Sequence, residues 1–139
     1  MISTGQKFSR KRGARRLMVK NLLSSLILYE KLETTSAKIK AIKSLIEKIL
    51  QKTKSTQDLI TLRRYLSKYF TTQNPIDKII NVYKPNLVSQ NKLINVYKIK
   101  KRKGDGALIG LIVINPEITK IKFEKKESNK TEKVDNKKK

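Results

Sequence analysis

Residues 14–50 read ARRLMVKNLLSSLILYEKLETTSAKIKAIKSLIEKIL, and the spacing of their apolar residues predicts a helix, a short strand and a second helix. The first helix spans residues 14–31; its apolar face is formed by Met18, Leu22, Leu26 and Tyr29 and is widened by Leu17, Leu23, Ile27 and Leu28. Residues 31–35 end in two β-branched threonines, which predicts a brief strand. Ser36 is then the expected N-cap of the second helix. The apolar face of that helix consists of Ile39, Ile42, Ile46, Ile49 and Leu50.

Two more helices are predicted downstream. The third carries Leu59, Leu62, Leu66 and Tyr69 or Phe70 on its apolar face, with Arg63 and Arg64 exposed between them. The fourth is marked by its ends: Asn74 is the expected N-cap, Pro75 takes the first helical position, and Pro85 stops the helix.

Residues 93–101 and 108–115 are rich in Ile, Val and Tyr, and the residues between them include the Gly/Asp turn Arg102-Lys103-Gly104-Asp105-Gly106. This pattern predicts a β-hairpin. Tyr65, Tyr69, Tyr83 and Tyr97 continue the apolar pattern, so we expect them in the core and not stacked on bases.

The order of these elements predicts an α+β fold in which a small sheet packs on helices. We expect a basic N-terminal arm (residues 1–13), one α+β domain (14–116) and a Lys-rich disordered tail (117–139). The arm is also compatible with a mitochondrial transit peptide, but Gly5 and Gly13 interrupt it and it runs directly into an apolar helix.

The charge of the chain points to a polyanionic partner. It has 34 Lys+Arg against 11 Asp+Glu, a formal net charge of +23 on 139 residues, and no acid precedes Glu30. A free compact protein gains nothing from such self-repulsion, whereas nucleic acid phosphates neutralise it and release counterions. A second basic cluster, Lys98, Lys100, Lys101, Arg102 and Lys103, lies at the predicted hairpin tip, where lysines can also protect an edge strand from aggregation.

Several function classes are excluded by composition. The absence of Cys and His excludes a disulfide framework, a Cys/His zinc site and nucleophile schemes that need either residue. Asp105 and Glu117 are the only acids near the hairpin, and Asp105 before a glycine is far more often a turn residue. We therefore expect no enzyme activity, catalytic residue, metal, cofactor, small-molecule substrate or membrane span.

A pattern of polar and apolar residues in the first third carries a family resemblance: Gly5, Lys7, Arg10, Arg15, Lys20, Asn21, Leu22, Ser25, Leu26, Glu30, Lys31, Glu33, Thr34, Thr35, Ala37 and Lys38. With them, residues 5–50 resemble the bacterial large-subunit ribosomal protein L-seventeen family. Further on, the pair Arg63-Arg64 and the turn Arg102-Lys103-Gly104-Asp105 resemble that family's paired arginines and hairpin turn.

The resemblance implies a helix, a strand, three helices and two strands, and a structural role on the large ribosomal subunit. It also implies contacts with large-subunit rRNA near the side where the nascent chain leaves, next to neighbouring ribosomal proteins. Combined with the charge pattern, it indicates these RNA-binding candidates: Lys7, Arg10, Lys11, Arg12, Arg15, Arg16, Lys20, Asn21, Lys38, Arg63, Arg64, Lys100, Lys101, Arg102 and Lys103.

Three departures from the family pattern affect this interpretation. Ala14 stands where the family usually has His, residues 91–95 lack a usual Gly-Gly-Tyr-Thr-Arg segment, and the Lys-rich tail has no counterpart. A nucleoid-type DNA-binding protein is the alternative from the same charge evidence, although no groove-entering module is recognisable. A bacterial cytoplasmic ribosome and a mitochondrial or plastid ribosome are both compatible with the Ile-, Lys- and Asn-rich composition.

Overall fold

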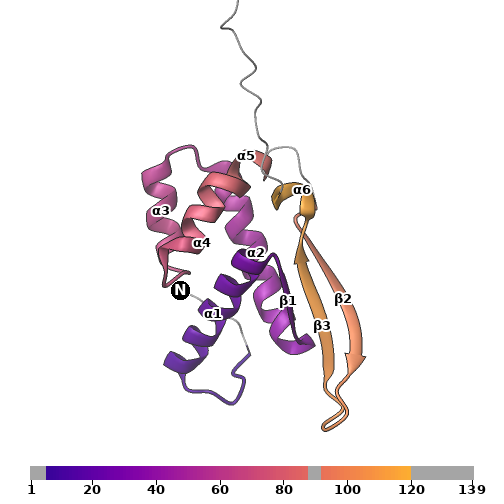
Figure 1. Cartoon of the computed structure of the whole chain (residues 1–139). Coiled ribbons are helices and arrows are strands. Elements are labelled where there is room, and N and C mark those ends of the chain that lie inside the picture. The colour runs from indigo at the N-terminus through magenta and orange to yellow at the C-terminus, as the bar shows by residue number, and fades with distance from the viewer. Residues whose placement is uncertain (1–5, 88–91, 120–139) are drawn as a thin grey trace, which may run out of the picture.

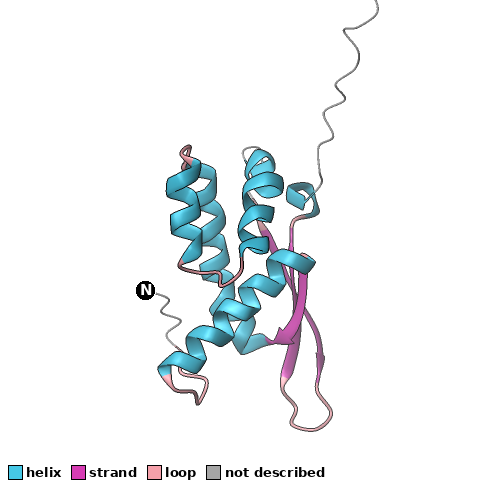
Figure 2. Ribbon diagram, turned by 60° about the vertical axis from the view of Figure 1, so that its left-hand side comes forward, coloured by secondary structure: helices cyan, strands magenta, loops and turns pink. Residues whose placement is uncertain are grey.

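Helices form one layer of the molecule and a three-stranded sheet forms the other (Figures 1 and 2). The computed structural model describes residues 6–87 and 92–119. Its elements, in order, are α1 (Arg12–Tyr29), β1 (Lys31–Thr35), α2 (Ser36–Ser55), α3 (Leu59–Ser67), α4 (Gln73–Lys78), the π-helical turn η1 (Ile79–Tyr83), α5 (Lys84–Leu87), β2 (Ile94–Lys101), β3 (Leu108–Ile114) and α6 (Pro116–Thr119). The predicted α+β fold and its element order are confirmed.

The sheet has the strand order β1-β3-β2, and both pairings are antiparallel. β2 and β3 therefore form the predicted hairpin, and β1 pairs with β3. Thr35 at the end of β1 lies opposite Ile109, next to the hairpin tip, whereas Lys31 at its start lies opposite Val113. The start of α2 therefore lies at the same end of the sheet as the hairpin tip.

The helices cover one face of the sheet with an aliphatic core. Ile112 and Ile114 of β3 are buried together with Leu23, Leu26 and Ile27 of α1. From α2, the core receives Ile39, Ile42, Leu45, Ile46, Ile49 and Leu50. In Figure 2 the strands lie behind the helices, and no helix of the described chain lies on their other side.

Gly110 of β3 lies in close contact with both α2 and the paired strand β2. A Cβ atom at this position would lie 2.9 Å from Cδ1 of Ile39 and 2.9 Å from the carbonyl oxygen of Tyr97. Both distances are below normal van der Waals contact, and the Tyr97 oxygen belongs to the backbone of the paired strand. The Ile39 methyl group can move, but the Tyr97 backbone oxygen cannot move without shifting β2, so only glycine allows the present approach of β2 to β3.

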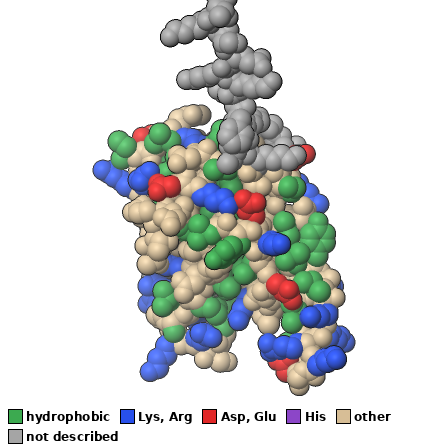
Figure 3. Space-filling view, viewed as in Figure 1, with side chains coloured by type: hydrophobic (Ala, Val, Ile, Leu, Met, Phe, Trp, Pro, Cys, Tyr) green, Lys and Arg blue, Asp and Glu red, His purple; other side chains and the backbone are tan. Residues whose placement is uncertain are grey.

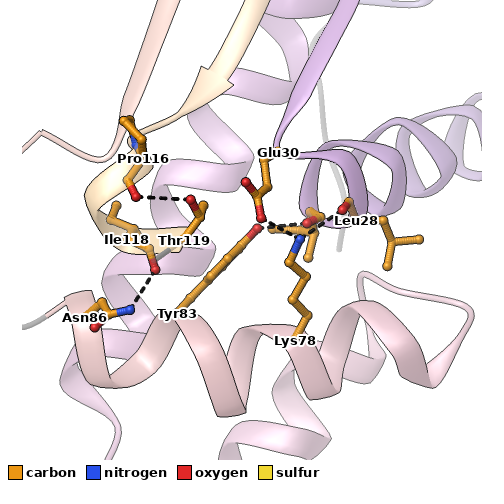
Figure 4. Close-up of polar contacts among 9 residues, drawn as sticks. Leu28, Glu30, Lys78, Tyr83, Asn86, Pro116, Ile118 and Thr119 are labelled. Atoms are coloured by element: carbon orange, nitrogen blue, oxygen red, sulfur yellow. Dashed lines mark hydrogen bonds and ion pairs between the residues drawn. The ribbon is translucent and has the colours of Figure 1, made fainter. Parts of the chain in front are cut away.

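A polar cluster ties the end of α1 to the fourth helix (Figure 4). Glu30 has a left-handed backbone (φ 65°) and ends α1. Lys78 Nζ lies 2.8 Å from Glu30 Oε1 and donates to the Leu28 carbonyl at 2.9 Å, while the buried Tyr83 hydroxyl donates to the Ile27 carbonyl at 2.8 Å. Burial raises the pKa of Tyr83, so this hydroxyl stays a donor. These bonds satisfy carbonyl groups that the end of a helix leaves without partners.

Two predicted N-cap residues are wrong, although the second helix does begin at Ser36. Thr35 is the N-cap of α2, and Thr72, not Asn74, is the N-cap of α4. Neither threonine makes a side-chain capping bond. Pro75 is tolerated in the first turn because backbone N–H groups there have no partner within the helix.

Pro85 does not stop the fourth helix. The chain passes through it as α5, after the π-helical turn η1, in which the Lys84 N–H donates to the Ile79 carbonyl five residues back. Proline removes one helical hydrogen bond and crowds the preceding turn, and a widened turn accommodates both effects.

The hairpin turn is closed by a charge-assisted hydrogen-bonded pair. Arg102 Nε donates to Asp105 Oδ1 at 2.9 Å, and its Nη2 donates to the second carboxylate oxygen. Asp105 Oδ1 also accepts from the Ala107 N–H at 3.2 Å, and Gly106 supplies the positive φ (65°) that the turn needs. The Arg102 hydrogen bond is the main reason that the pKa of Asp105 lies below its ordinary value. The Gly/Asp turn is confirmed.

Some residues predicted on apolar faces are exposed, because one sheet and a few short helices cannot cover them. Those residues are Leu17, Leu28, Tyr29, Leu59 and Tyr97. At the other end of the chain, Ile118 of α6 is buried, so the fold includes residues beyond the expected boundary at 116. Residues 1–5 of the expected arm and residues 120–139 of the expected tail lie outside the described residues.

We predict that Gly110→Ala lowers the free energy of unfolding by about 1–3 kcal/mol, as overpacking in a close contact does. The matched control is Gly104→Ala, where an added Cβ meets nothing within 4 Å and the expected change is within about 0.5 kcal/mol. Denaturant unfolding of both variants checks this. Equal stability of the two variants would contradict the tight packing of α2 on β3.

A second prediction concerns the turn. NMR titration of the Asp105 carboxyl should give a pKa below the ordinary 3.8. Because folding lowers this pKa, the pair stabilises the fold above pH 3.8 and that contribution is lost as pH falls through the lowered value. In Arg102→Gln the pKa should rise toward 3.8. An unchanged pKa in that variant would mean that Arg102 is not its main cause.

Candidate nucleic-acid interface

The loop before α1 presents an exposed cationic turn. Lys7, Arg10 and Lys11 are exposed, and the Arg10 N–H donates to the Lys7 carbonyl at 3.2 Å. Phe8 (φ 54°) and Ser9 (φ 49°) adopt the left-handed region between them, which costs roughly 1–2 kcal/mol for each non-glycine residue. The loop thus turns sharply into α1 with its cations pointing to solvent.

The start of α1 favours an anion. Its N-cap, Lys11, makes no side-chain capping bond, and the first turn holds no acid. Arg12 is exposed, while Arg15 and Arg16 are half-buried along the next turn. Cations at a helix N-terminus oppose the helix dipole by roughly 0.3–1 kcal/mol each, a cost that an anion docked there removes. Lys20 and Asn21 follow one turn later, half-buried and exposed respectively.

The hairpin tip carries the second cluster. Lys100, Lys101 and Lys103 are exposed, and no acid of the tip other than Asp105 lies beside them in the sequence. Arg102 is exposed as well, but its guanidinium is held by Asp105. Its structural effect is to shape the turn, so the lysines are the better phosphate ligands.

The fold brings these clusters to one end of the molecule, here called the basic end. It consists of the loop at residues 6–11, the first half of α1, the start of α2 and the hairpin tip. The register of β1 places the start of α2 beside the tip, and α1 begins at the same lower end in Figures 1 and 2. Lys38, half-buried in the first turn of α2, therefore belongs to this end as well. In Figure 3 blue side chains gather at this lower end, under α1 and on the hairpin.

Arg63 and Arg64 lie elsewhere, on α3, and the structure does not bring them to the basic end. Arg63 Nη2 lies 3.0 Å from Asp77 Oδ1 and links α3 to α4. Arg64 is exposed next to it and acts on Asp58 only through its charge. The two arginines are therefore separate from the candidate interface, and Arg63 has an internal structural role.

The acids of the described chain are largely used internally. Glu30 pairs with Lys78, Asp77 with Arg63, Glu47 with Lys43 and Asp105 with Arg102. Asp58 caps α3, accepting from the Ile60 and Thr61 N–H groups. The Thr61 hydroxyl is the first cause that holds the pKa of Asp58 below its ordinary value. Among these acids only Asp105 belongs to the basic end, where it pairs with Arg102.

One cationic residue of this end is absent from the candidates that the sequence indicated. Lys40 is exposed in the second turn of α2, on the same end of the helix as Lys38. The sequence shows that Lys40 is on the polar face, but only the pairing of β1 with β3 shows which end of α2 lies beside the hairpin.

The prediction that Tyr65, Tyr69, Tyr83 and Tyr97 lie in the core is confirmed only in part. Tyr83 is buried, and Tyr65 and Tyr69 are half-buried against each other with ring centroids 5.2 Å apart. Burial raises the pKa of Tyr65 to about 12. Tyr97 is 54% exposed on β2, so placing it in the core is wrong.

The described part of the chain holds neither a metal site nor a membrane-spanning helix. In residues 6–87 and 92–119, no three His, Cys, Asp or Glu side chains come together as a metal site. No helix in the same ranges is long and apolar enough to cross a bilayer.

Comparison with known proteins identifies one family. Residues 18–114, more than half of the chain, match the family model of ribosomal protein L17. The chain is 35% identical over 109 residues to the large ribosomal subunit protein bL17 of Thermomicrobium roseum, covering 78% of this chain and 92% of that protein. The bL17 of Clostridium acetobutylicum is 33% identical over 113 residues, covering 81% and 97% respectively. Together these similarities show that the chain belongs to the ribosomal protein L17 family, whose members are structural constituents of the large ribosomal subunit and not enzymes.

Proposed function

We propose that this protein binds large-subunit ribosomal RNA through its basic end. The observation that carries the proposal is the convergence of the loop at residues 6–11, the start of α1, Lys38 and the hairpin lysines on one end of the fold. Asp105 is the one acid of this end within the described residues, and it is paired with Arg102. Clustered cations repel one another, and phosphates convert that repulsion into binding.

In this mechanism the folded layers act as a rigid spacer. The loop before α1 and the hairpin tip each contact phosphates, and the core holds them at a fixed separation. The Arg102–Asp105 pair pre-forms the turn, so less conformational entropy is lost when Lys101 and Lys103 bind. Phosphate contacts of this kind set position and orientation more than sequence specificity. The protein would therefore join two RNA segments in a defined geometry.

Membership of the L17 family decides against the nucleoid-type alternative. The similar proteins named above are bacterial, which favours a bacterial cytoplasmic ribosome over a mitochondrial or plastid one. A position near the nascent-chain exit, beside neighbouring ribosomal proteins, is part of the proposal and is supported by the family resemblance alone. Crosslinking from a photoreactive group in stalled nascent chains to this protein would test that position.

We predict that Arg10→Ala, Arg15→Ala and Arg16→Ala, combined in one variant, weaken binding to a large-subunit rRNA fragment. The slope of log K against log salt should fall by roughly 0.7–0.9 for each phosphate that the variant no longer neutralises. Filter binding or calorimetry at several salt concentrations measures both quantities, and circular dichroism verifies that the variant is folded.

The matched control removes the same charge away from the basic end. Lys48, Lys54 and Lys68 are exposed on α2 or just after α3, and replacing all three with Ala should leave the slope nearly unchanged. If the slope falls equally in the two variants, the effect is one of net charge, and the basic end is not the interface.

A further inference from the structure

The sheet has a second face that no element of the described chain covers, here called the open face. Val113, Leu111 and Ile109 of β3 run down its centre, half-exposed. The register places Lys31 and Asn95 beside Val113, Glu33 and Tyr97 beside Leu111, and Thr35 and Lys100 beside Ile109. The alternate residues of β3, including Ile112 and Ile114, are buried under the helices.

The centre of this face is apolar in a protein whose surface is otherwise rich in cations. Its three central residues are β-branched or leucine, and Tyr97 adds an aromatic ring that is 54% exposed. A solvent-facing sheet surface ordinarily alternates to polar residues at these positions. An apolar face that is left open on a small protein marks a contact surface.

Glu33 decides which kind of partner this surface fits. It is exposed in the same row as Leu111 and Tyr97, and within residues 6–87 and 92–119 it forms none of the ion pairs that engage Glu30, Glu47 and Asp77. The Glu33 carboxylate repels phosphate, and the aliphatic strip of β3 itself offers RNA neither stacking nor hydrogen bonds. Tyr97 could stack on a base and Lys31 and Lys100 could contact phosphate, but all three flank this strip and do not form its centre. Such a surface fits protein: apolar side chains on the β3 strip and a cation opposite Glu33.

We propose that the open face docks a neighbouring protein of the large subunit, through an apolar segment that carries a Lys or Arg opposite Glu33. The inference rests on the proposed function, since it places the protein on the subunit with its basic end on RNA. The basic end then binds phosphates, and the open face binds protein. Tyr97 is the expected anchor, because exposed tyrosines are enriched in protein interfaces.

The test uses large subunits purified from cells that express the full chain. A photoreactive phenylalanine analogue replaces Tyr97, whose exposed ring can be exchanged without disturbing the core. A second preparation carries the photoreactive residue at Lys11, in the basic end. After irradiation, nuclease and protease treatment distinguish RNA adducts from protein adducts, and mass spectrometry identifies the crosslinked peptide.

We expect Tyr97 to give a nuclease-resistant adduct with a protein of the subunit, at a peptide that holds apolar residues and a Lys or Arg. Adding Glu33→Lys should lower the yield by about tenfold or more, because it places like charges opposite each other. The control Glu117→Lys makes the same charge change on α6, away from the open face, and should leave the yield unchanged. Replacing the partner's basic residue with Glu should restore the yield in the Glu33→Lys background.

An RNA adduct at Tyr97, an adduct with a second copy of this chain or with its own residues 120–139, or no adduct overturns the inference. The same holds if Glu33→Lys and Glu117→Lys behave alike. The Lys11 preparation separates this failure from that of the proposed function. An RNA adduct at Lys11 without a protein adduct at Tyr97 rejects only the docking surface, whereas no RNA adduct at Lys11 argues against RNA binding by the basic end.

Discussion

The antiparallel pairing of β1 with β3 is the contact on which the rest of the structure depends. It joins residues 31–35 to residues 109–113 and so closes the chain around its core. It also places the start of α2 at the hairpin tip, where Ile39 of α2 packs closely on Gly110 of β3. Long-range strand pairing of this kind requires the loop entropy of the intervening helices to be offset by burial, which the aliphatic core supplies.

The acidic residues mostly contribute to the fold, and the excess basic residues belong to the proposed function. Acids are used where they hold the chain together: Glu30 with Lys78, Asp77 with Arg63, and Asp58 at the start of α3. Most of these groups are exposed, and an exposed ion pair contributes only about 0–1 kcal/mol to the stability of the fold. Their main effect is therefore to orient the helices. The excess cations at the basic end repel one another, and under the proposed function bound phosphates remove that repulsion.

Much of the fold could be predicted from local pattern. The helical periodicity of residues 14–50, the short strand before α2 and the Gly/Asp turn at Gly106 are properties of nearby residues, and the structure confirms them. The predictions that are wrong depend on distant contacts. The N-caps are Thr35 and Thr72 instead of Ser36 and Asn74, and a π-helical turn carries the chain through Pro85. Tyr97 is exposed because no helix of the described chain covers its face of the sheet.

The candidate interface divides in the same way. The acid-free N-terminus and the lysines of the turn are local features, and composition alone predicts that they bind a polyanion. Only the tertiary structure shows that they lie at the same end of the molecule as Lys38. It also shows that Arg63 pairs with Asp77 and that Arg102 pairs with Asp105. The physical reason is the distance along the chain over which each interaction acts. Helix and turn propensities depend on a few neighbouring residues, whereas the packing of the whole chain determines which charges and which strands pair.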